Sequence, residues 1–251
     1  MRILYSAISP CRAGCKYCFA KWNDIYPGQP RLDEINQETG EKQAIIYPCC
    51  DGEFFDQHNL VSLVEEYAQS MEKVYVSIST KQRLEEKSLY ELVQLNNNLT
   101  AANKGFVKFS ISLSCKTMLT EIEPETMSYS ERLDLAKCVC ETGIPNSLTL
   151  KPILPFIPED EYFEIIDDFS SYLRHILVGG LYVNRDSEFF LKHIKGKWDA
   201  SPRTVGWIAG APKWDYVADE SKMSAICSFS RSRNMHVFDS DVDLIKSYNN
   251  K

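Results

Sequence analysis

Three cysteines near the start of the chain have a spacing that suits metal chemistry. Cys11, Cys15 and Cys18 form a C-x3-C-x2-C pattern. Thiolates bind zinc and iron–sulfur clusters, but a structural zinc ion needs four ligands, usually from two cysteine pairs. This stretch supplies three ligands, and the sequence has no second C-x2-C pair. Three cysteines on a cubane [4Fe–4S] cluster would leave one iron free to bind another molecule; a zinc site completed by a distant cysteine or histidine is the alternative.

The elements that must position these cysteines alternate between strands and helices. Six apolar runs rich in β-forming residues are typical of strands, and segments with helical periodicity lie between them. This alternation predicts a parallel α/β sheet, and six strands fall short of the eight in a complete TIM barrel. The predicted strands span residues 2–8, 44–48, 73–79, 106–112, 147–154 and 175–183.

Helices between the strands are indicated by periodicity and by end signals. In residues 58–71 the apolar residues recur at the spacing of one helix face. The segment 128–145 opens with Ser128 and Glu131 in capping-box spacing. Another helix is expected after Pro158, where acidic residues in the first turn are favoured by the helix dipole.

Polar and sulfur-bearing residues follow most of the predicted strands. In parallel α/β folds, chemistry takes place at the carboxyl ends of the strands. We therefore expect the side chains at these ends to meet at one mouth of the sheet. The ends carry the cysteine loop, Cys50 to Glu53, Thr80 with Lys81, Ser112, and Lys151.

The cysteine pattern, with the aromatic Tyr17 before its last cysteine, resembles the signature of the radical SAM (S-adenosylmethionine) superfamily. This resemblance implies a partial (β/α)6 TIM-like barrel in which Cys11, Cys15 and Cys18 hold a [4Fe–4S] cluster. It also implies that the open iron binds the amino and carboxylate groups of SAM. One electron from the reduced cluster would then cleave SAM to a 5′-deoxyadenosyl radical, which abstracts a hydrogen atom from the substrate.

Within that superfamily, roughly residues 5–160 resemble the spore photoproduct lyase branch. In that branch a cysteine at the end of the second strand donates a hydrogen atom to a substrate radical, and Cys50 matches its position. Asp51-Gly52-Glu53 is similar to the motif that grips the SAM amino group. The resemblance implies that the residues that contact SAM are Tyr17, Gly52, Glu53, Lys81, Ser110 and Ser112.

Two parts of the chain depart from that branch. Lys151 stands where the lyase has alanine, which adds a charge near the expected adenine or carboxylate end of SAM, and we count it among the cofactor-binding residues. Beyond residue 183 the resemblance ends. We expect residues 1–195 to form the partial barrel and residues 196–251 to form a short irregular C-terminal extension that could act as a substrate lid.

The charge distribution bears on the substrate. The formal net charge is −7, so the surface as a whole is not built to hold a polyanion. Residues 192–233 nevertheless carry eight basic and four acidic side chains, a local net charge of +4, and three of the four tryptophans follow residue 196. Cations contact phosphates and indoles stack on bases. A lid whose tryptophans pack over the barrel explains the same residues.

Three functions are compatible with these observations. The first is a radical SAM enzyme acting on nucleic acid or a nucleotide, and the second is a radical SAM enzyme acting on a peptide or small metabolite. Either would need an external electron donor such as flavodoxin or ferredoxin. The third, a non-catalytic metal-binding interaction protein, is disfavoured because Glu53, Lys81 and Ser110 are all present in order.

The location of the protein is predicted from its cysteines and its hydropathy. Nine cysteines at this clustering are typical of metal-binding or reactive thiols in a reducing compartment and not of disulfides. No apolar run approaches the roughly 20 residues that a membrane-spanning helix needs. We therefore expect a cytoplasmic protein without a membrane partner.

Overall fold

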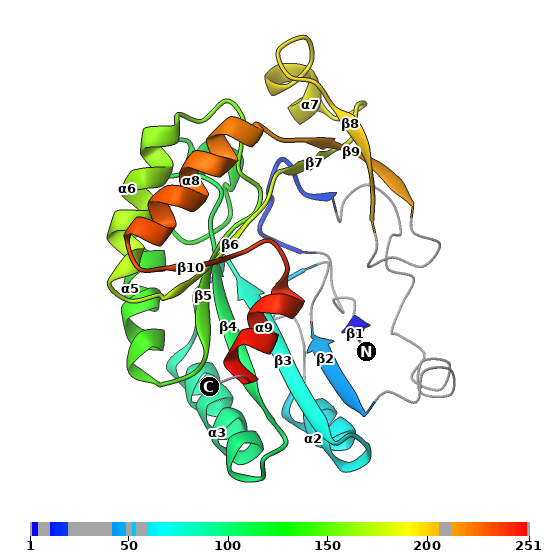
Figure 1. Cartoon of the computed structure of the whole chain (residues 1–251), viewed down its shortest axis with the longest axis vertical. Coiled ribbons are helices and arrows are strands. Elements are labelled where there is room, and N and C mark those ends of the chain that lie inside the picture. The colour runs from blue at the N-terminus through cyan, green and yellow to red at the C-terminus, as the bar shows by residue number, and fades with distance from the viewer. Residues whose placement is uncertain are drawn as a thin grey trace.

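A seven-stranded parallel sheet forms the centre of the molecule (Figure 1). The computed structural model describes residues 2–4, 11–19, 42–48, 52–53, 60–205 and 212–249. The strand order is β1-β2-β3-β4-β5-β6-β10, and within the described residues β1 and β10 do not pair, so the sheet is an open, partial barrel. Its strands are β1 (Arg2–Leu4), β2 (Gln43–Tyr47), β3 (Lys73–Thr80), β4 (Gly105–Ser112), β5 (Asn146–Leu150), β6 (His175–Val178) and β10 (His236–Phe238).

Helices cover the outer face of this sheet. Because side chains alternate along a strand, Val74, Val76 and Ile78 of β3 all point to that face, and they belong to the main hydrophobic core. The capping box predicted at Ser128 and Glu131 is confirmed. The helices on this side are α2 (Leu60–Ser70), α3 (Glu86–Ala101), α5 (Tyr129–Glu141), α6 (Glu159–Ser170) and α8 (Glu220–Ser232). The short helix α4 (Leu119–Ile122) lies between β4 and α5 in the chain.

The last helix, α9 (Asp241–Asn249), lies against the inner face of the sheet (Figure 1). There Ile245 packs with Tyr75 of β3 in a small separate core. Lys108 of β4 is only 1% exposed and pairs with Asp241 at the first residue of α9, and the Ser77 hydroxyl donates to the same carboxylate at 2.5 Å. Because a buried ammonium needs a counter-charge, this pair holds α9 inside the partial barrel.

A second, three-stranded antiparallel sheet stands beside the carboxyl ends of the main strands. Its order is β7-β9-β8, from β7 (Leu181–Val183), β8 (Ser201–Thr204) and β9 (Lys213–Val217), and the short helix α7 (Glu188–His193) follows β7. The predicted irregular extension therefore needs correction, because residues after 196 supply β8, β9, α8, β10 and α9. Strand β8 is exposed along its whole length, so it lacks the apolar alternation by which a strand is recognised in a sequence.

The sequence-based fold prediction is confirmed in its main features. All six predicted strands are present, and the sheet is parallel with helices between its strands. The predicted strand 175–183 is divided at Gly179 and Gly180 into β6 and β7, which belong to different sheets. No helix in the described part of the chain has the length and apolar character needed to cross a membrane.

Candidate active site

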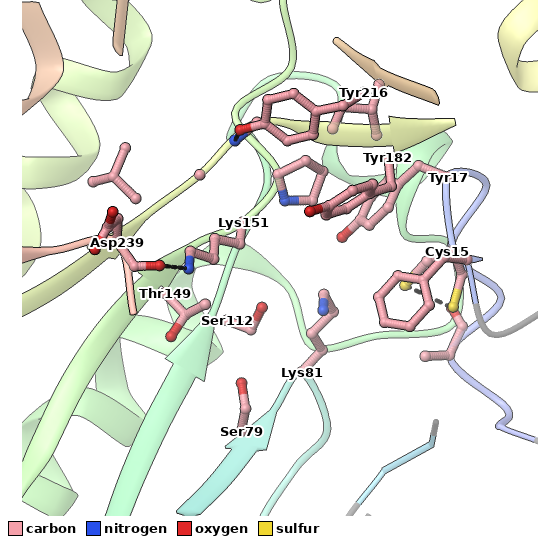
Figure 2. A pocket seen from close by; sticks show the side chains of 18 of the residues that line it. Cys15, Tyr17, Ser79, Lys81, Ser112, Thr149, Lys151, Tyr182, Tyr216 and Asp239 are labelled. Carbon is pink, nitrogen blue, oxygen red and sulfur yellow. Dashed lines mark hydrogen bonds between the residues drawn. The ribbon is translucent and has the colours of Figure 1, made fainter. Parts of the chain in front are cut away.

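A cavity of about 610 Å³ opens at the carboxyl ends of the main strands (Figure 2). The cysteine loop forms one part of its wall, and the ends of β3, β4 and β5 form another. The turn at Gly179 and Gly180 and all three strands of the second sheet complete it. A cavity of this size suits a small-molecule ligand or cofactor.

Cys11, Cys15 and Cys18 all line this cavity. Burial raises the pKa of Cys11, and it raises the pKa of Cys15 to about 12. A metal that coordinates a thiol removes its proton outright, so these pKa values do not prevent the cysteines from acting as ligands.

The arrangement of the three thiols bears on the metal group that they could hold. Among the described residues, no three Cys, His, Asp or Glu side chains gather around one point as a tetrahedral zinc ion would require. In a cubane cluster each cysteine binds a different iron, so the thiols can be spread along one wall of the cavity.

The cysteine loop is held against the segment that contains α4. The backbone N–H of Lys16 donates to the carbonyl of Ile122 at 2.9 Å. Gly14 adopts a φ of 66°, and a Cβ atom there would lie 3.3 Å from Pro124. Glycine therefore allows both the left-handed turn and the close approach of the two segments.

Glu53 and Lys81 meet at the cavity between the cysteine loop and the end of β3. The Glu53 carboxylate accepts a hydrogen bond from the Thr80 hydroxyl at 2.6 Å and from the Lys81 backbone N–H at 3.2 Å. Burial raises the pKa of Glu53, against the opposing charge of Lys81. Burial opposes the charged form of Lys81. The neighbouring groups Glu123, Cys15 and Glu53 nevertheless raise its pKa, so the ammonium persists.

A buried ion pair lies behind the cysteine loop. Arg132 Nη1 donates to Glu123 Oε2 at 2.7 Å, and both side chains are fully buried. The Tyr17 hydroxyl donates to the other oxygen of Glu123. Although burial opposes ionisation of Glu123, Lys81 and Arg132 hold its pKa below the usual value.

Two of the predicted serines occupy different positions. Ser112, at the end of β4, lines the cavity. Ser110 does not, because it lies deeper in the sheet, where its hydroxyl is 2.7 Å from that of Ser147 on β5. Thr149, paired with Ser112 across the strands, lines the cavity with a buried hydroxyl that has no hydrogen-bond partner within the described structure. Such a hydroxyl is a ready partner for a ligand.

Lys151 crosses the far end of the cavity from the cysteines. Figure 2 shows its ammonium bonded to the main-chain carbonyl of Asp239, in the segment before α9. Burial lowers the pKa of Lys151, against the neighbouring charges of Asp241 and Asp239. The stem of Lys151 also covers Gly179, where a Cβ atom would approach its Cε to 2.7 Å.

Aromatic rings of the second sheet form the wall opposite the strand ends (Figure 2). The rings of Tyr182 and Tyr216 have centroids 5.0 Å apart, and Arg203 lies 4.4 Å over the Tyr216 ring. No acidic partner of Arg203 occurs in the described residues. The Tyr216 hydroxyl accepts the Gly180 N–H at 2.7 Å, and a Cβ atom on Gly180 would lie 2.6 Å from that hydroxyl oxygen. This contact ties the second sheet to the main one.

The structure thus brings most of the predicted site residues to one cavity. Cys50 lies outside the described residues, and Ser110 lies away from the cavity. The predicted site residues that do line the cavity are Tyr17, Gly52, Glu53, Lys81, Ser112, Lys151 and the three cysteines.

Sequence reasoning missed five residues that line the cavity or support it. The strand alternation that places Ser147 and Lys151 on the inner face also places Thr149 there, so that residue could have been found. The others have no local signal, because they depend on the second sheet and on the fold around α4. These missed residues are Thr149, Tyr182, Tyr216, Arg203 and Glu123.

Comparison with known proteins identifies this fold. No protein-family model matches the sequence, and comparison with curated proteins finds no match. A spore photoproduct lyase variant with bound AdoMet and dinucleoside spore photoproduct is similar in structure, with a TM-score of 0.62 and 15% identity over 94% of this chain and 75% of that one. Streptococcus suis SuiB bound to S-adenosylmethionine has a TM-score of 0.54 and 16% identity over 99% of this chain and 52% of that one.

Both of these structures contain SAM, and the chain shares their fold. At 14–16% sequence identity, this similarity shows a shared fold only. The chain spans about half the length of SuiB.

Proposed function

We propose that the protein is a radical SAM enzyme that holds a [4Fe–4S] cluster on Cys11, Cys15 and Cys18 and binds SAM beside it. The observation that carries this proposal is that the three cysteines, Glu53 and Lys81 line a single cavity. The fold shared with enzymes that bind SAM supports it. When bound, the cluster and SAM would supply a 5′-deoxyadenosyl radical that abstracts hydrogen from a substrate.

The charged side chains beside the cysteines suit the two ends of an amino acid. Glu53 lines the cavity, held by hydrogen bonds from Thr80 and Lys81, and its carboxylate would pair with the SAM ammonium. The Lys81 ammonium would donate to the SAM carboxylate as a charge-assisted hydrogen bond. Tyr17 and Gly52 would complete this end of the site.

The hydroxyls farther along the wall suit the nucleoside part of SAM. Thr149 has a free buried hydroxyl, and Ser112 lines the cavity opposite it on the next strand. Lys151 has three donors, of which one is engaged by the Asp239 carbonyl, so it can bind a further acceptor. We assign these three side chains to hydrogen bonds with the ribose or adenine.

The proposed substrate is a nucleotide or nucleic acid, recognised by the second sheet. Tyr182 and Tyr216 offer ring faces for stacking, and Arg203 offers a cation without an acidic partner in the described structure. A peptide or small basic metabolite is the second candidate, because the carboxylates of Glu220 and Asp239 also line the cavity. Cys50 is proposed as the hydrogen donor to the substrate radical.

An anaerobic SAM-cleavage assay tests the proposal. The protein is reconstituted with iron and sulfide, reduced with dithionite and given SAM, and 5′-deoxyadenosine is quantified by chromatography. The expected result is a cluster absorbance band and 5′-deoxyadenosine, both lost in Cys15→Ala and retained in Cys138→Ala, whose thiol is exposed on α5. One tightly held zinc ion with no iron and no SAM cleavage would refute the enzyme and favour a metal-binding interaction protein.

A partner and a location follow from the same proposal. Turnover in the cell would need an external one-electron donor such as flavodoxin or ferredoxin, and the reducing conditions that protect the cluster suit a cytoplasmic location.

A further inference from the structure

The ion pair between Arg132 and Glu123, behind the cysteine loop, has a defined orientation. Arg132 binds one carboxylate oxygen of Glu123 from the side away from the loop, and Tyr17 binds the other oxygen from within the loop. Tyr17 lies between Cys15 and Cys18 in the sequence. The carboxylate of Glu123 is therefore bonded directly to the cysteine loop, and Cys15 is the cysteine that experiences its charge.

Arg132 fixes this orientation through contacts with the main chain. Its guanidinium also donates to the carbonyl of Ser112 at 2.8 Å and to the carbonyl of Met127 at 3.2 Å. The Met127 N–H in turn donates to the carbonyl of Lys81 at 2.9 Å. The ion pair is thus built into the ends of β3 and β4, at the points where the cavity begins.

Lys81 supplies a positive charge on the cavity side of the same carboxylate. Within the described residues its ammonium has no hydrogen-bond partner, and Glu123 is the group whose negative charge favours it most. The Cys15 thiol in turn experiences Lys81 and Glu123 as its two strongest neighbouring charges, of opposite sign. Solvent screening is weak at Glu123 and at Cys15, which are 1% and 6% exposed, whereas Lys81 is partly exposed.

We propose that Glu123, which is buried, and Lys81, which is partly exposed in the cavity, set the reduction potential of the proposed cluster in opposite directions. Glu123 is a positioning residue, since it acts through Tyr17 and its field and does not touch the cavity. This inference rests on the proposed function, because it concerns the cluster held by the three cysteines. Net charge and hydrogen bonding around a cluster are established determinants of its potential.

The two charges affect the reduction potential because reduction adds an electron to the cluster. Reduction places one more negative charge on the cluster, and a carboxylate nearby disfavours that state whereas an ammonium nearby favours it. Removal of the Glu123 charge should therefore shift the midpoint potential to more positive values, and removal of the Lys81 charge should shift it to more negative values. A residue that only braces the loop would move the potential in the same direction in both variants, or not at all.

The test is a redox titration of the reconstituted protein without substrate, followed by electron paramagnetic resonance. Glu123→Gln keeps the shape and the hydrogen-bonding oxygen of the side chain, and Lys81→Met keeps most of its volume. The expected result is a positive shift in Glu123→Gln and a negative shift in Lys81→Met. Glu121→Gln and Lys87→Met remove the same charges at exposed positions and should leave the potential unchanged.

A milder variant covers the case in which Glu123→Gln does not fold. Tyr17→Phe removes one hydrogen bond from the Glu123 carboxylate, leaves its charge less compensated and should shift the potential to more negative values. Shifts of the same sign in Glu123→Gln and Lys81→Met, or none in either, would overturn the inference. If the wild-type protein takes up no cluster, it is the proposed function that fails, so the two failures are distinguishable.

Discussion

Removal of Arg132 should destabilise the chain far more than removal of an exposed arginine. In Arg132→Met the Glu123 carboxylate stays buried and loses its ion-pair partner, and Tyr17, Ser114 and the charge of Lys81 remain around it. The carbonyls of Ser112 and Met127 also lose their donor. Breaking a buried pair by removing one partner costs about 3–5 kcal/mol, and we expect a loss of free energy of unfolding in that range.

The matched controls separate this cost from the loss of a side chain. Arg185→Met removes an arginine whose ion pair with Asp215 is largely exposed, so solvent screening should make its effect much smaller. The double variant Arg132→Met with Glu123→Leu removes both charges. Because an apolar pair of similar volume is often as stable as the ion pair it replaces, the double variant should recover much of the loss.

The assay is urea unfolding of the metal-free chain, in reducing buffer, with an unchanged m value as the check that only stability has altered. The folded pKa of Glu123 lies below its usual value of 4.5, so the wild-type pair stabilises the fold at neutral pH and loses this contribution as the pH falls through the folded pKa. The difference between wild type and Arg132→Met should therefore be largest near neutral pH and smaller in acid. A loss below about 1 kcal/mol in Arg132→Met, or a double variant that is no more stable than Arg132→Met, would refute this reasoning.

Three further predictions follow from other parts of the structure. Lys108→Met should lower the free energy of unfolding by about 3 kcal/mol in urea, because Asp241 loses its buried partner and α9 its anchor; unchanged stability would show that the pair does not hold α9. Gly180→Ala should lower the free energy of unfolding by about 1–3 kcal/mol, because a Cβ atom there would lie 2.6 Å from the Tyr216 hydroxyl oxygen. An unchanged free energy of unfolding would contradict that contact. Cys50→Ala should still cleave SAM but release a different substrate product, and an identical product would exclude Cys50 as the hydrogen donor.

The parts of the fold that could be predicted from the sequence are those with strong local patterns. The capping box at Ser128 and the acidic first turn after Pro158 both begin helices where expected. The cysteine spacing and the residues at the predicted strand ends together placed Glu53 and Lys81 at the same cavity as the cysteines. These features depend on neighbours in the chain, which a sequence displays directly.

The features that escaped prediction depend on contacts between distant segments. Arg132 lies in an amphipathic helix, where an arginine is normally solvated, and its burial follows only from the fold of the α4 segment around it. Strand β10 has three residues and joins the main sheet after a gap of more than 50 residues from β6. Ser110 and Ser112 have the same parity on β4, so the sequence places both on the inner face but does not say which one reaches the cavity.

The measurement that tests the central claim most directly is electron paramagnetic resonance of the reduced, reconstituted protein before and after addition of SAM. If the three cysteines hold a cluster with one open iron, SAM should change the g values of the cluster signal, and Cys15→Ala should give no such signal. A cluster signal that is identical with and without SAM, at concentrations where binding is saturated, would show that SAM does not occupy the open iron and would contradict the account.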